Sequence, residues 1–151
     1  MSAPKKTEPT SKRGGRGDTD AASDVPLRVV QLTDSHLFAD PAGKLLGLTT
    51  RRSFEAVLAL AIERSAPVDA LVMTGDLVHD GSTRGYRYLR RVLEATRLPC
   101  FCIPGNHDQR DRMGECLGPL NVADLSVQRL GTWKLIFVDS TSPGEDGGWI
   151  A

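Results

Sequence analysis

Residues 70–76 constrain the fold of this chain more than any other stretch. They read Ala-Leu-Val-Met-Thr-Gly-Asp, which is apolar for the length of a strand and then ends at a glycine and a carboxylate. A short apolar run bounded in this way is typical of an internal strand that is buried on both faces. Such a strand delivers Asp76 to the carboxyl edge of its sheet, where open α/β sheets bind ligands. The sequence therefore predicts a parallel sheet with a site at that edge.

Two other apolar segments end in the same manner. Residues 27–34 and 100–104 are both of strand length, and polar residues follow each of them directly. The first segment ends at Asp34, which is followed by Ser35 and His36. The second is followed by Gly105, Asn106, His107 and Asp108. Three strands are thus expected to bring carboxylates, imidazoles and one amide to a single place.

Helical patterns separate these strands. In residues 50–65 apolar side chains recur at i, i+3, i+4, i+7 and i+8, which predicts an amphipathic helix. Ser82 is placed to cap a second helix, whose apolar stripe includes Tyr86 and Leu89. The order strand, helix, strand, helix, strand favours an α/β fold with a right-handed, largely parallel sheet.

The remaining segments carry weaker signals. Residues 37–48 are predicted to be a loop, because Asp-Pro-Ala-Gly within them is a turn signal. Residues 110–117 fit a short helix, and residues 125–130 and 133–139 alternate across Gly131-Thr132 as a hairpin does. Residues 1–25 are polar and lack aromatic side chains, so we expect a disordered tail there.

Composition excludes several classes of function. Lys and Arg number 19, as do Asp and Glu, so the formal net charge is zero and no binding of nucleic acid through bulk charge is expected. Neither an apolar run of about 18 residues nor a signal peptide is present, so no membrane association and a cytoplasmic location are expected. Cys100, Cys102 and Cys116 fit reduced core thiols better than a metal site, because no other Cys or His lies at a zinc-ribbon spacing.

The residues that follow the strands suit divalent metal ions. Asp34 and His36 stand two residues apart, so an anionic oxygen and a neutral nitrogen can reach one cation. The Asp76 carboxylate can offer one oxygen to each of two cations, and Asn106 adds a neutral carbonyl oxygen. Two divalent ions carry about +4 and the two carboxylates return about −2, which leaves about +2 for a hydroxide and a phosphoryl group.

Other roles follow from this assignment. His107 is expected to be the general acid, with Asp80 or Asp108 holding its tautomer. Gly75 and Gly105 remove a Cβ where the backbone turns sharply or approaches a ligand closely.

Each motif alone has a structural explanation, such as a loop cap or a satisfied histidine, and only their convergence favours a metal site. His79 has no motif partner and is expected to be a surface histidine.

These motifs resemble the calcineurin-like metallophosphoesterase superfamily. Its pattern is D-x-H, then G-D-x-x, then G-N-H-D/E, followed by a lone His and G-H-x-H. Here the first three blocks stand at 34–36, 75–76 and 105–108. More narrowly, residues 35–47 and 75–81 resemble the bacterial class III 3′,5′-cyclic-AMP phosphodiesterases. Asp80 stands four residues after Asp76, as in that branch, which argues against a protein phosphatase.

The resemblance implies a fold, a cofactor and a reaction. The fold is a four-layer αββα sandwich, and the cofactor is a pair of Fe, Mn or Zn ions. Asp34, His36 and Asp76 would hold the first ion, and Asp76 and Asn106 the second. Asn106 and His107 would contact the substrate phosphate, and the substrate-binding set would also include His36 and Asp76. The implied reaction is hydrolysis of 3′,5′-cyclic AMP to the 5′-nucleotide by a hydroxide that both metals activate.

The chain departs from the family pattern after His107, because no later histidine follows. We therefore expect residues 26–151 to be the N-terminal portion of a metallophosphoesterase domain, with an incomplete second sheet and weak metal binding. A broader-specificity metallophosphoesterase and an inactive metal-binding or partner-binding fragment remain open as alternatives. An unfinished sheet edge after Asp139 predicts association into a homodimer.

Overall fold

The computed structural model describes residues 26–122, 125–142 and 145–150. The predicted disordered tail, residues 1–25, lies outside the described residues. No helix within the described part of the chain is long and apolar enough to cross a membrane.

A three-stranded parallel sheet forms the centre of the molecule. It consists of β1 (Val29–Leu32), β4 (Ala70–Thr74) and β5 (Cys100–Ile103) in the order β1-β4-β5, so the strand with the strongest apolar pattern is the central one. Leu32 pairs with Met73, and Thr74 pairs with Ile103. The three carboxyl ends therefore lie at one edge, as the sequence predicts.

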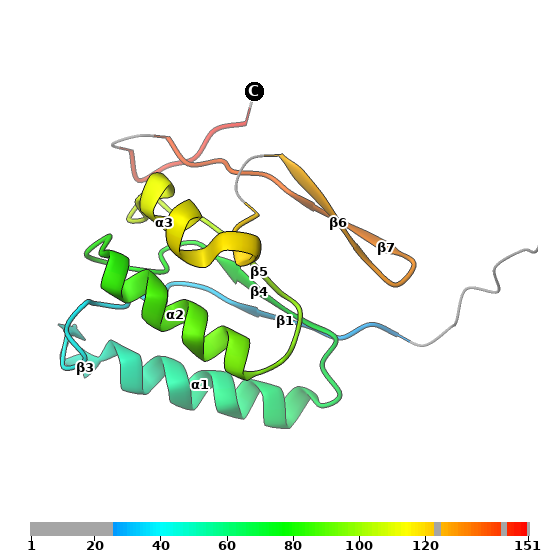
Figure 1. The fold of residues 1–151 in the computed structure, drawn as a ribbon, viewed down its shortest axis with the longest axis horizontal. Coiled ribbons are helices and arrows are strands. Elements are labelled where there is room, and N and C mark those ends of the chain that lie inside the picture. The colour runs from blue at the N-terminus through cyan, green and yellow to red at the C-terminus, as the bar shows by residue number, and fades with distance from the viewer. Residues whose placement is uncertain (1–25, 123–124, 143–144, 151) are drawn as a thin grey trace, which may run out of the picture.

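Two helices cover one face of this sheet, α1 (Thr50–Ser65) and α2 (Thr83–Ala95) (Figure 1). Their buried side chains join the core with the strands. The Ser82 hydroxyl accepts a hydrogen bond of 3.1 Å from the backbone N–H of Gly85, so the predicted N-cap is confirmed. Helix α1 has the bounds that the apolar periodicity predicts, and α2 begins directly after the predicted cap.

The second half of the chain adds a further layer. A short helix, α3 (Arg110–Leu117), packs beside α2 and continues into the 3-10 turn η1 (Gly118–Leu120). Strands β6 (Ser126–Leu130) and β7 (Trp133–Phe137) then form the predicted hairpin, which lies across the sheet from α1 and α2 (Figure 1). The Phe137 ring packs 5.4 Å from that of Phe101 on β5. Helices, parallel sheet and hairpin thus form successive layers of an α/β fold.

The loop prediction for residues 37–48 is wrong in part. Strands β2 (Lys44–Leu45) and β3 (Leu48–Thr49) pair antiparallel within it. Leu46 and Gly47 connect them with φ of 48° and 85°, the sign that a two-residue hairpin turn requires at both positions. The small hairpin carries exposed leucines next to the segment that follows β1.

The cysteines are free and buried, as expected of core thiols. Burial raises the pKa of the Cys100 and Cys102 thiols, so both stay protonated at neutral pH.

Candidate active site

The segments that follow β1 and β4 are held together by backbone hydrogen bonds beyond the strands. The N–H of Asp34 donates to Gly75 O at 3.1 Å, and that of His36 donates to Asp76 O at 2.9 Å. Asp34, His36 and Asp76 have φ of 56°, 40° and 50°, which is uncommon for residues that carry a side chain. Such conformations persist where the surroundings fix them, and they are concentrated at functional sites.

These turns bring together a group of two carboxylates and one imidazole, which we call the carboxylate group: Asp34, His36 and Asp76. The Nε2 atom of His36 lies 3.8 Å from Asp34 Oδ1 and 3.6 Å from Asp76 Oδ2. These separations exceed a hydrogen bond but suit donor atoms that surround one cation. Two oxygens and one imidazole nitrogen accept Mn, Fe and Zn. Three of the predicted metal ligands therefore meet, and metal binding by them stays a prediction.

Backbone contact places the third block against Asp76. A Cβ at Gly105 would collide with the carboxylate and backbone nitrogen of Asp76, so only glycine fits there. Gly75 has φ of 91°, and a Cβ on it would stand 3.1 Å from Gly105 Cα. The N–H of His107 donates to Asp76 Oδ1 at 3.2 Å. The expected close approach at both glycines is confirmed, although the close neighbour is the backbone of the chain itself.

Asn106 faces a cavity of about 260 Å³ between the strand ends and the segment after β7. Its Nδ2 atom donates a hydrogen bond of 3.2 Å to Asp146 Oδ1, which leaves the amide oxygen as the atom available to a cation. Asp34 and Asp76 line the same cavity. Asp146 is a residue that the sequence patterns did not single out.

The expectation that His79 is a surface histidine is wrong. Its Nδ1 atom lies 3.2 Å from His36 Nδ1, and its ring stacks on that of His107 at 4.8 Å and 27°. His79 follows Asp76 by three residues, in the segment that β4 delivers to the site. Burial lowers the pKa of His79, and repulsion from His107 and His36 lowers it further, so the ring is neutral near pH 7.

The two acidic candidates for orienting His107 are both hydrogen-bonded elsewhere. Asp80 accepts from the backbone N–H of Ala39 at 2.8 Å and of Ser82 at 3.1 Å, and so joins two loops. Although burial opposes ionisation of Asp80, these hydrogen bonds lower its pKa. The role of Asp80 toward His107 stays a prediction.

Asp108 has a positioning role that the sequence did not reveal. Its buried carboxylate accepts hydrogen bonds of 2.9–3.0 Å from the N–H groups of Leu77, Val78 and Gly105 and from the hydroxyl of Tyr86. Burial and the neighbouring carboxylate raise the pKa of Tyr86, so the hydroxyl remains a donor. Asp108 therefore joins the segment after β4 to the one after β5.

Comparison with known proteins agrees with this arrangement. A family model described as calcineurin-like phosphoesterase matches residues 27–144, which is most of the chain. The chain belongs to the calcineurin-like phosphoesterase family. Its α/β fold with a parallel sheet is the one the sequence resemblance implies.

Several curated relatives of this chain are named as cyclic-nucleotide enzymes. The 3′,5′-cyclic adenosine monophosphate phosphodiesterase CpdA of Pseudomonas aeruginosa is 33% identical over 129 residues, covering 85% of this chain and 47% of that protein. CpdA of Escherichia coli K12 is 33% identical over 86% of this chain and 48% of its own length. The 3′,5′-cyclic-nucleotide phosphodiesterase alr5338 of Nostoc is 33% identical over 78% of this chain and 44% of its own length. The chain spans about half the length of the curated relatives it matches.

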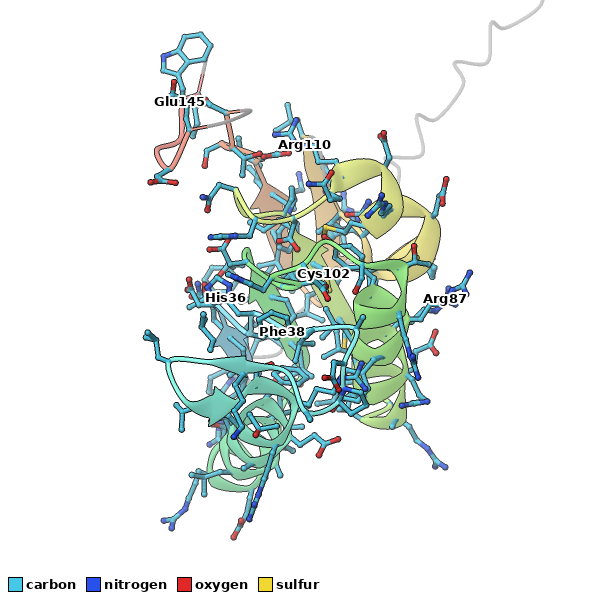
Figure 2. All side chains as sticks on the ribbon, turned by 90° about the vertical axis from the view of Figure 1, so that its left-hand side faces the viewer. His36, Phe38, Arg87, Cys102, Arg110 and Glu145 are labelled. Atoms are coloured by element: carbon cyan, nitrogen blue, oxygen red, sulfur yellow. The ribbon has the colours of Figure 1, made fainter. Side chains whose placement is uncertain are left out.

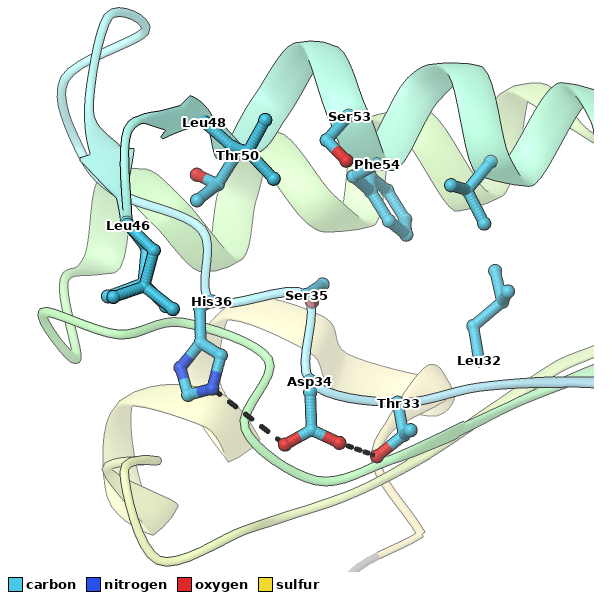
Figure 3. Close-up of a pocket in the computed structure, with 12 residues that line it drawn as sticks. Leu32, Thr33, Asp34, Ser35, His36, Leu46, Leu48, Thr50, Ser53 and Phe54 are labelled. Carbon is cyan, nitrogen blue, oxygen red and sulfur yellow. Dashed lines mark hydrogen bonds and ion pairs between the residues drawn. The ribbon is translucent and has the colours of Figure 1, made fainter.

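An apolar pocket of about 230 Å³ adjoins the carboxylate group. Figure 3 shows His36 and Asp34 at one side of it and Leu46, Leu48 and Phe54 at another. Leu46 is 97% exposed at the tip of the β2–β3 hairpin. Sequence reasoning missed this pocket because it arises only when the hairpin folds over α1.

Figure 2 shows His36 and Phe38 near the middle of the molecule on the segment after β1, whereas Arg87 points away from α2.

Proposed function

We propose that this chain carries the N-terminal part of the active site of a metal-dependent phosphodiesterase that hydrolyses 3′,5′-cyclic nucleotides, cyclic AMP among them, to 5′-nucleotides. In this proposal residues 26–151 contribute to one metallophosphoesterase domain. The names of the relatives support the substrate class, and the geometry supports the reaction class.

The observation that carries the proposal is the carboxylate group. Asp34 and His36 follow β1 and Asp76 follows β4, yet their ligand atoms all lie within 4.8 Å of one another. Two like charges held this close repel each other unless a cation lies between them, so the arrangement favours metal binding. Asp34 is 60% exposed while Asp76 is 16% exposed, so one carboxylate faces solvent and the other faces the third block.

These residues fit the metal ions that the family implies. Asp34, His36 and Asp76 would hold one ion, and Asp76 with the free oxygen of Asn106 would contribute to a second. Mn, Fe and Zn all accept this donor set. When bound, such ions supply Lewis acidity and lower the pKa of a water molecule, so that hydroxide exists near neutral pH.

The chain itself supplies positioning and proton transfer. The ring of His107 is exposed at the edge of the site, and it would protonate the departing oxygen of the ester. The backbone N–H of His107 donates to Asp76, which fixes this carboxylate beside the reacting phosphate. Asp80, through its loop contacts, would hold the segment that carries His79 against the site.

The two hollows beside the carboxylate group offer separate places for the parts of a nucleotide. The cavity next to Asn106 is lined mostly by polar groups and suits the phosphate, whereas the pocket under the β2–β3 hairpin suits an apolar base. Zero net charge supports a small substrate rather than nucleic acid. Free, buried thiols support a reducing compartment, and we infer a cytoplasmic location.

The direct test is hydrolysis of 3′,5′-cyclic AMP by this chain in excess Mn²⁺. We expect activity that a chelator abolishes. We also expect Asp76→Asn to raise the activation barrier by about 3 kcal/mol, which lowers the rate about a hundredfold. Asp40→Asn is the matched control, because Asp40 lies in a surface turn and an amide oxygen can still accept from the Ala42 N–H. Equal rates for the Asp76 and Asp40 variants would refute the proposal.

Substrate comparison separates the cyclic-nucleotide assignment from broader specificity. Cyclic AMP, a bis-aryl phosphodiester and an aryl monophosphate would be compared under the same conditions. Faster hydrolysis of the monoester than of either diester would contradict the cyclic-nucleotide assignment while keeping the reaction class. Metal binding without turnover of any substrate would support the second candidate, an inactive metal-binding protein.

A further inference from the structure

The sequence contains only three histidines, and the fold brings all of them to one place. His36 follows β1, His79 follows β4, and His107 follows β5. The ring centroids lie 4.8–5.2 Å apart, and one nitrogen from each ring lies within 4.8 Å of the others. We call these residues the imidazole group. The proposed hydrolysis uses two of its members and gives His79 no direct task.

The imidazole group is distinct from the carboxylate group, although both contain His36. The Nε2 atom of His36 faces the two carboxylates, while its Nδ1 atom faces His79 Nδ1 at 3.2 Å. Ring nitrogens around a tetrahedral zinc ion, with bonds of about 2.0–2.1 Å, lie about 3.3 Å apart. The spacing of this pair therefore already matches two ligands of one ion.

The surroundings hold this pair in place and leave the third ring free to adjust. The N–H of His79 donates to Leu37 O at 2.9 Å, and Leu37 and Val78 form a backbone bridge between the two segments. The Phe38 ring packs 5.0 Å from that of His79. His107 is exposed, and one of its ring nitrogens already lies within 4.8 Å of a nitrogen of each of the other two rings, so a rotation of its side chain suffices to bring that nitrogen to the same ion.

We propose that His36, His79 and His107 form a separate site for one late first-row divalent ion, with Zn²⁺ as the typical occupant and a fourth position open to water or an anion. Three neutral imidazoles bind Co²⁺, Ni²⁺, Cu²⁺ and Zn²⁺ in preference to Mg²⁺ or Mn²⁺, which favour oxygen ligands. Loading of this site withdraws His107 from the ester. As a consequence that rests on the proposed function, zinc would oppose hydrolysis that manganese supports.

The test uses Co²⁺ as a visible-absorption probe, with binding as the readout instead of activity. In an Asp34→Asn background, which disables the carboxylate group without removing an imidazole, we expect Co²⁺ to give the intense bands of tetrahedral coordination. Adding His79→Ala is expected to weaken Co²⁺ binding by at least about tenfold and to abolish those bands. Circular dichroism of the metal-free variants checks that each one folds.

Nitrogen-15 NMR of the wild-type chain gives an independent test that needs no variant. With three histidines in the sequence, each ring contributes its own pair of signals. We expect Zn²⁺, added until both the carboxylate group and the imidazole group are saturated, to shift a nitrogen of all three rings. A shift confined to His36, or equal Co²⁺ affinity with and without His79, would overturn the inference. The 3.2 Å contact between the Nδ1 atoms of His36 and His79 would then be only a hydrogen bond between the two rings. Because neither measurement uses a substrate, failure here leaves the proposed hydrolysis to be judged separately.

Discussion

At the scale of single residues, the site depends on how closely the backbone at Gly105 approaches Asp76. A Cβ at this position would collide with rigid backbone as well as with the carboxylate. We expect Gly105→Ala to lower the free energy of unfolding by about 1–3 kcal/mol, as overpacking does in a tight interior. We also expect weaker binding of Mn²⁺, because the Asp76 side chain must turn away. Thermal melting and isothermal titration would measure the two effects.

Gly114→Ala is the matched control for this substitution. Gly114 lies within α3, and a Cβ there would meet only Asn121 Nδ2 at an ordinary 3.5 Å. Alanine is the better helix former, so we expect a gain of up to about 1 kcal/mol. Unchanged stability and Mn²⁺ affinity in Gly105→Ala would show that the backbone can relax around the site.

At the scale of elements, the two helices that cover the sheet begin in different ways. The Ser82 side chain caps α2, whereas Thr49 at the start of α1 makes no side-chain cap hydrogen bond. Ser82→Ala is therefore expected to cost about 1 kcal/mol of stability, and Thr49→Ala less than about 0.5 kcal/mol. Chemical denaturation of both variants measures the difference. Equal losses would mean that the Ser82 hydrogen bond contributes nothing net.

The elements also show how far local sequence patterns reach. Residues 100–103 and 110–117 form the strand and helix that were expected, because apolar periodicity and turn residues act over neighbouring positions. The β2–β3 hairpin escaped prediction because strands of two residues are too short to show a period.

The candidate site likewise contains residues that local sequence patterns predict and residues that only the tertiary fold brings in. Asp34, His36 and Asp76 could be predicted to meet, since parallel strands end at one edge of a sheet. His79 could not be placed by its own neighbours, because its partners His36 and His107 come from other segments. The Asp108 hydrogen bonds likewise join positions about 30 residues apart and depend on tertiary packing.

At the scale of the whole molecule, the β6–β7 hairpin is the least covered part of the described structure. Val127 and Ile136 pair across the hairpin, and their side chains are 56% and 66% exposed, while Trp133 is 62% exposed. The hairpin forms a sheet of two strands only, so each strand has one side without a partner strand in the described part of the chain. Exposed apolar strands with unpaired edges favour association with another chain.

We therefore expect the chain to form dimers or larger species through this hairpin as its concentration rises. A lysine in place of Ile136 puts a charge into the exposed apolar pair of Val127 and Ile136 without changing the buried layer, so Ile136→Lys should shift the population toward monomer. Leu60→Lys is the matched control, because Leu60 is 52% exposed on α1, across the sheet from the hairpin. Sedimentation velocity over a range of concentrations would measure the mass of each variant. A wild-type chain that stays monomeric throughout, or equal dissociation in both lysine variants, would contradict association through the hairpin.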